Sequence, residues 1–179
     1  MASQTELTTL AELNFLPYLN ENGEINPELE KQIGVYAIFD QEQTLQFVAY
    51  SRDIYTSLKQ HLVRQPNCCC WIKVKTIERP SRSTLAAIQD AWIEENGTIP
   101  PGNSHYQSQW SAPIDATLIM TDTEKQNYAQ ADELTQSKLL KNVARRLEAE
   151  IKDTLSARGV TMEIRFNPKL KEQGKLDLK

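Results

Sequence analysis

The chain has 179 residues, of which 40% are hydrophobic and 25% are charged, a balance typical of an ordered globular protein of about one domain. Twenty basic and 24 acidic residues give a net charge of −4, which argues against a broad nucleic-acid-binding face because such a face needs excess positive charge. No apolar run approaches the roughly 20 residues that cross a bilayer, so we do not expect an integral membrane protein.

The N-terminal residues contain no Lys or Arg before Lys31 and no continuous apolar core, which is unlike a signal or transit peptide, so we expect a cytoplasmic protein. Three adjacent cysteines, Cys68, Cys69 and Cys70, have neither the spacing of a metal-binding pair nor the even number of a disulfide framework. We expect structural or incidental thiols in a reducing compartment, and their role stays open.

The first half of the chain predicts short strands that alternate with helices. Residues 1–32 form a leader with a weak helix near 5–13. Turn formers, apolar alternation and capping residues then predict strands at 34–39, 45–50 and 69–77, a helix from Ser51 or Asp53 to Arg64, and a helix from Ser81 or Ser83 to Asn96–Gly97. The short link between the first two strands favours an antiparallel hairpin.

The second half begins with a long loop, which we expect Tyr106 and Trp110 to tuck against the fold. Helical periodicity then runs from about Thr123, Gly159 stands at a helix C-cap, and residues 160–166 alternate as a last strand. The predicted class is α+β: about three strands in a small antiparallel or mixed sheet flanked by helices, with a C-terminal helix–strand extension. We expect a leader (1–32), a core (33–103) and a remainder (104–179) packed on that core.

One family resemblance follows from the motif Gly34-Val35-Tyr36, from Phe47-Val48-Ala49 further along, and from "YSRDI" at the start of the next helix. With the order of elements, residues 33–103 resemble the GIY-YIG endonucleases. That resemblance implies a site in which tyrosine activates water, arginine stabilises the phosphate, and glutamate holds a divalent cation.

The resemblance places the family's site on Tyr36, Phe47, Ser57 and Gln89, with His61 at a further polar position. Three of the four main groups have changed type, from Tyr to Phe, Arg to Ser and Glu to Gln. Losing one such group commonly costs 10²–10³-fold in rate. We therefore expect a remnant site without catalysis, cofactor or metal.

A second resemblance spans nearly the whole chain. The segments "AWIEENGTIPPGN" and "LKNVARRLEAEI" look like a family of cyanobacterial and plastid proteins that includes photosystem I assembly factors. It implies a pseudoenzyme of photosynthesis with a protein partner, acting as an assembly factor at the cytoplasmic face of the thylakoid membrane.

Two alternatives stay open. The first is an active nuclease that uses Tyr36, His61, Arg52 and Glu94 with Mg²⁺ or Mn²⁺ held by Glu94, although helical geometry points Glu94 away from the buried face. The second is a nucleic-acid-binding module whose basic patch could hold a phosphate and consists of Lys73, Lys75, Arg79 and Arg82.

Overall fold

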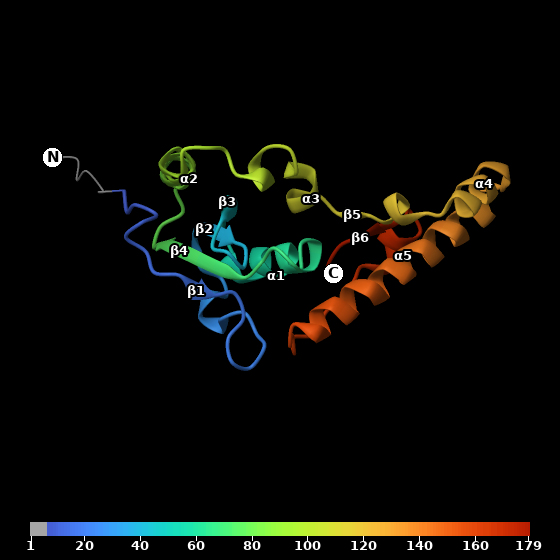
Figure 1. The fold of residues 1–179 in the computed structure, drawn as a ribbon, viewed down its shortest axis with the longest axis horizontal. Helices are drawn as coiled ribbons and strands as arrows, with labels where there is room; N and C mark the ends of the chain where they lie inside the picture. Colours follow the sequence, from blue (N-terminus) through green and yellow to red (C-terminus); the bar gives the residue numbers. More distant parts are fainter. Residues whose placement is uncertain (1–6) are drawn as a thin grey trace. The chain divides into compact units, whose positions relative to one another are not determined.

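The computed structural model describes residues 7–179, which form two compact units (Figure 1). The first unit ends at Ser111 and the second runs from Ala112 to Lys179. The predicted packing of residues 104–179 on the core stays a prediction.

The first unit is built on a four-stranded antiparallel sheet with the order β1-β4-β2-β3. Its strands are β1 (Leu16–Pro17), β2 (Ile33–Phe39), β3 (Leu45–Ser51) and β4 (Trp71–Ile77). The predicted α+β class is confirmed. The strand count differs because the expected leader contributes β1, a two-residue strand that pairs with β4 at the edge of the sheet.

The two longer helices of this unit begin and end where local signals predict. In α1 (Ile54–Arg64) the Asp53 side chain accepts from the backbone of Thr56, and in α2 (Arg82–Asn96) Ser81 caps in the same way. Gly97 ends α2 with φ of 83°, a left-handed conformation that glycine adopts without strain. Three short helices complete the unit: η1 (Pro27–Leu29), η2 (Pro101–Asn103) and α3 (Gln107–Ser111).

The central strand β2 is buried on both faces, which explains its unbroken apolar sequence. Val35, Ala37 and Phe39 share one core cluster with α2. Tyr36 lies on the opposite face, toward α1 and α3. Gly34 lets β4 approach closely, since a Cβ at this position would lie 2.2 Å from the carbonyl oxygen of Lys75.

The predicted helix near residues 5–13 is wrong for its described part, and residues 5 and 6 lie outside the described chain. Residues 10–13 form a turn in which Leu13 donates to the carbonyl of Leu10. The carboxylate of Glu95 accepts from the amides of Leu10 and Ala11, each at 2.9 Å. These amides are therefore held by a side chain of α2 instead of by a helix of their own.

The long loop after α2 is partly as expected. Trp110 is buried, whereas Tyr106 is 51% exposed and does not tuck against the fold. The buried ring belongs to the short helix α3, which turns the end of this segment into an ordered part of the first unit.

The second unit (Figure 1) contains the two-stranded sheet of β5 (Ile114–Asp115) and β6 (Lys175–Leu176) and a long helix, α5 (Glu133–Ala157). Its remaining elements are η3 (Ala116–Ile119), α4 (Asp122–Gln130) and α6 (Pro168–Lys171). Within residues 7–179, no helix combines the length and apolar character that crossing a membrane requires.

Gly159 follows α5 with φ of 81°, as predicted. The predicted strand at 160–166 is wrong, because only Phe166 forms a β-bridge, with Leu178. Val160, Met162 and Ile164 line a small groove with Leu155 of α5. Their alternation therefore reflects packing beside a helix and not pairing in a sheet.

We expect Glu95→Ala to lower the free energy of unfolding by about 1–3 kcal/mol, because it removes a charged acceptor from two backbone amides. The amides of Leu10 and Ala11 should also exchange faster with solvent. Glu94→Ala is the matched control, since Glu94 is exposed on the same helix, and its effect should stay within about 0.5 kcal/mol. Denaturant melts measure the stability of each variant, and amide hydrogen exchange measures the protection of the two amides. Equal effects of the two variants would contradict a stabilising role for the bonds from the Leu10 and Ala11 amides to Glu95.

Candidate functional site

The structure joins Tyr36 and His61 in a buried hydrogen-bonded chain. The Tyr36 hydroxyl lies 2.8 Å from Nε2 of His61, and Nδ1 of His61 lies 2.9 Å from the carbonyl oxygen of Trp110. Since a carbonyl only accepts, Nδ1 carries the proton, and Nε2 accepts from the tyrosine. The guanidinium of Arg64 donates to the same carbonyl at 3.1 Å.

Burial determines the protonation states of His61 and Tyr36 in this hydrogen-bonded chain. It lowers the pKa of His61 from 6.5 to about 4, with the positive charge of Arg64 as a second cause and the Trp110 carbonyl opposing them. Burial also raises the pKa of Tyr36 well above its usual range, and a smaller opposing effect comes from its interaction with the Ser57 side chain. Both groups are therefore neutral at pH 7, and neither is placed to exchange a proton with a substrate.

The other predicted remnant residues also have structural partners. Phe47 stacks on Trp110 with ring centroids 5.2 Å apart and meets the edge of His61 at 4.7 Å. The Ser57 hydroxyl donates to Ser51 at 2.7 Å. Tyr36, Phe47 and His61 are all at most 5% exposed, so this cluster is a packed core.

Gln89 binds backbone instead of an ion. Its amide nitrogen donates to the carbonyl of Val48 at 3.0 Å, and Asn103 donates to the same oxygen while accepting from the Val48 amide, both at 2.8 Å. Glu94 is exposed, as its helical position predicts. Among residues 7–179, no three His, Cys, Asp or Glu side chains are grouped to hold a metal ion.

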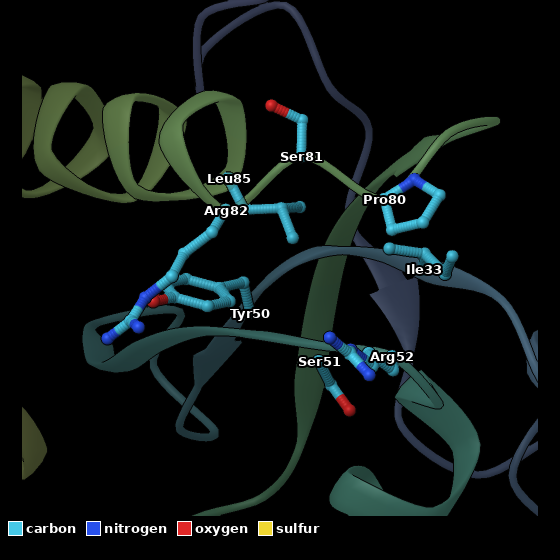
Figure 2. Close-up of a pocket in the computed structure, with 8 residues that line it drawn as sticks. All are labelled: Ile33, Tyr50, Ser51, Arg52, Pro80, Ser81, Arg82 and Leu85. Atoms are coloured by element: carbon cyan, nitrogen blue, oxygen red, sulfur yellow. The ribbon is translucent and has the colours of Figure 1, made fainter.

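An open pocket lies beside this core, between the end of β3 and the start of α2 (Figure 2). Its volume is about 300 Å³, and its lining combines two arginines, two serines, a tyrosine and three apolar residues: Ile33, Tyr50, Ser51, Arg52, Pro80, Ser81, Arg82 and Leu85. Arg52 follows β3, and Arg82 is the first residue of α2. The lining contains no acidic residue.

The serine hydroxyls of the pocket are already used. Ser51 donates to the carbonyl of Asp53 at 2.9 Å, and Ser81 donates to the hydroxyl of Thr84 at 2.9 Å. In the part of the chain that the structure describes, Arg52 and Arg82 form no ion pair with a carboxylate. The two guanidinium groups are therefore the charged donors that a ligand in this pocket would meet, and the Tyr50 hydroxyl is a neutral one.

The four residues of the predicted basic patch do not converge. Lys73 is buried, donates to the carbonyl of Leu10 at 3.0 Å, and lies over the ring of Phe15. Arg79 is exposed outside the pocket lining, and Lys75 is partly buried. Only Arg82 reaches the pocket. Sequence reasoning considered its counterpart Arg52 only for catalysis, because nothing local joins residues 52 and 82.

The three cysteines lie just before β4 and form no disulfide. Cys69 is fully buried, and its thiol donates to the carbonyl of His61 at 3.6 Å. Cys68 and Cys70 are partly exposed. Burial raises the pKa of the Cys68 thiol, with the negative charge of Asp40 as a further cause. A raised pKa lowers the reactive thiolate fraction at neutral pH.

No protein-family model matches the chain. A 105-residue stretch is 34% identical to the bifunctional monothiol glutaredoxin-S16, chloroplastic, of Arabidopsis thaliana. The match covers 56% of this chain and 31% of the relative, so the chain spans about a third of the length of the curated protein that it matches.

This finding contradicts the assignment to the GIY-YIG endonuclease-like family, because the similarity found is to a monothiol glutaredoxin. The function inferred from that assignment, a GIY-YIG-fold assembly factor for photosystem I with a nuclease or nucleic-acid-binding module as alternative, is contradicted with it. The relative is named as chloroplastic, and the location of this chain stays a prediction.

We expect stability to fall as the pH drops from 6.5 toward 4, because the unfolded chain then protonates His61 while the folded chain keeps it neutral. The pKa difference corresponds to at most about 3 kcal/mol. Urea melts at a series of pH values should show this fall in the wild type and in His105→Gln, an exposed control. His61→Gln should be less stable at pH 7 and should lack this part of the fall; an unchanged pH profile would contradict the assignment.

Proposed function

We propose that this chain is a binding module that holds a small phosphate- or carboxylate-bearing molecule in the pocket of Figure 2. The observation that carries the proposal is that Arg52 and Arg82, 30 positions apart in the sequence, both line one cavity without an acidic residue. Two positive charges in one pocket are a marked local excess in a chain with a net charge of −4.

The chemistry of the lining supports an anionic ligand. Guanidinium groups donate two parallel hydrogen bonds to a phosphate or carboxylate, and such charge-assisted bonds are the stronger kind. Arg82 also stands in the first turn of a 15-residue helix, whose backbone dipole favours negative charge near its start. Tyr50, Ile33 and Leu85 offer an apolar wall to the rest of the ligand.

The same lining supports binding over reaction. It contains no His, Cys, Asp or Glu, so no general base of these types lies in the lining to activate its serines, whose hydroxyls already donate to protein acceptors. A volume of about 300 Å³ is at the lower end of the range for small-molecule sites. The ligand that fits this description is a small anion with one apolar or aromatic part.

We expect the double variant Arg52→Gln/Arg82→Gln to weaken the binding of inorganic phosphate and citrate by at least about tenfold, since a charged hydrogen bond contributes roughly 1.5–3 kcal/mol. Amide chemical shifts of residues 50–53 and 81–85 should follow the titration in the wild type. The control, Lys75→Gln/Arg79→Gln, removes the same charge outside the lining and should bind normally. An equal loss of affinity in both variants would show that binding depends on the overall charge of the protein, and it would overturn the proposal of a site in this pocket.

Thiol chemistry is the second candidate, because the relative is named a monothiol glutaredoxin and two of the three thiols are partly exposed. In this reading a thiolate of Cys68 or Cys70 attacks glutathione disulfide. One protein–glutathione disulfide forms, the disulfide bond of glutathione breaks, and one glutathione thiolate leaves and takes a proton from water.

The thiol candidate predicts a glutathione adduct, detected by intact-protein mass, that persists in Cys69→Ser and is lost in Cys68→Ser/Cys70→Ser. The pKa of Cys68 is raised, so if Cys68 is the site the wild type should react more slowly than free cysteine at pH 7. Its own reaction should be faster at pH 9 than at pH 7, because more of the thiol is then ionised. The absence of any adduct after prolonged incubation would exclude this candidate.

A further inference from the structure

A second cavity of the first unit has a largely apolar lining with one acidic residue, Glu21. Its volume is about 510 Å³, and it is lined mainly by leucines and by asparagine and glutamate side chains: Leu16, Pro17, Leu19, Asn20, Glu21, Asn26, Leu29 and Ile72. We call these residues the leader groove. Leu16 is 47% exposed, and Ile72, from β4, forms the buried part of the lining.

The leader groove is held in shape before any partner arrives. Tyr18 is buried, its hydroxyl donates to the carbonyl of Leu58, and its amide donates to the carbonyl of Cys70 at 3.0 Å. The Asn20 side chain accepts from the amides of Asn22 and Glu24, which closes the following turn. A preformed apolar groove loses little conformational entropy on binding, so the exposed Leu16 and the partly exposed Leu19 and Leu29 are available to a partner at low cost.

The charges near the leader groove indicate the charge of a partner that could bind there. Residues 16–30 contain four glutamates, Glu21, Glu24, Glu28 and Glu30, and no Lys or Arg. The field of two of them reaches α1, since the pKa of Tyr55 is raised first by burial and then by Glu30, Glu24 and Asp53. An anionic membrane surface would be repelled, whereas a segment with positive charges beside its apolar side chains would be attracted.

We propose that the leader groove is a docking site for a basic amphipathic segment of a partner protein. Its apolar side chains would cover Leu16, Leu19 and Leu29, while its Lys or Arg residues would lie near Glu21. A helix with an apolar stripe is the form expected, because β1 has only two residues and one is Pro17, which lacks the amide that strand addition uses. This surface shares no lining residue with the anion pocket, so it does not depend on the proposed function.

The test uses the full chain and three fluorescein-labelled 18-residue peptides in anisotropy titrations. The first peptide has Leu at positions that form one helical stripe and Lys elsewhere, the second keeps the Leu stripe with Glu in place of Lys, and the third is a scrambled form of the first. We expect saturable binding of the Leu/Lys peptide, at least tenfold weaker binding of the other two, and a decrease in affinity with added salt.

Variants then locate the site. Leu16→Ser should weaken binding about tenfold and Glu21→Gln about threefold. The matched controls, Leu118→Ser and Glu42→Gln, change an exposed leucine of the second unit and an exposed glutamate outside the groove, and should bind as the wild type does. Leu16 is half exposed, so its replacement should leave the far-UV circular dichroism unchanged.

Three results would overturn the proposal. The first is equal binding of the Leu/Glu peptide, and the second is an unchanged affinity in Leu16→Ser. The third is a concentration-dependent dimer in sedimentation that Leu16→Ser abolishes, which would make a second copy of this chain the occupant. The Arg52→Gln/Arg82→Gln variant should bind the Leu/Lys peptide normally, so failure of the anion pocket and failure of the groove are distinguishable.

Discussion

The first unit depends on the buried hydrogen-bonded chain that runs from Tyr36 through His61 to the carbonyl of Trp110. It joins the central strand β2, helix α1 and helix α3, and each of its polar groups is taken out of water. An unpaired buried polar group costs about 1–3 kcal/mol, so each member needs the next. The burial that makes these hydrogen bonds necessary also lowers the pKa of His61, which keeps its ring neutral and out of reach of a substrate.

Around this hydrogen-bonded chain, other polar side chains bond to neighbouring backbone and side-chain groups. Gln89 and Asn103 both reach Val48, and Ser57 binds Ser51. What remains open lies at the ends of the elements, where side chains can be partly solvated. The arginines of the pocket are of this kind, because one follows β3 and the other opens α2.

Strand β4 runs between the two candidate binding surfaces of the first unit. It begins near the leader groove, to which Ile72 contributes, and it ends just before Pro80 and Arg82, which line the anion pocket. One surface carries two arginines, and the other has Glu21 in its lining and three more glutamates in the same stretch of sequence. A chain with a net charge of −4 can therefore present two sites that attract ligands of opposite sign. The thiols lie at the groove end of β4, just before Trp71.

The sequence by itself determined the three longer strands and the two longer helices of the first unit, because the Asp53 and Ser81 caps, the left-handed Gly97 and the apolar runs of the strands are signals carried by neighbouring residues. The assignment of Tyr36, Phe47 and Gln89 to a remnant GIY-YIG site was contradicted by the similarity to a monothiol glutaredoxin. Only the tertiary structure decided that Lys73 is buried, that Arg52 and Arg82 share a pocket, and that residues 160–166 form no strand. The physical reason is that these outcomes depend on contacts between segments far apart in the chain, which no local pattern encodes.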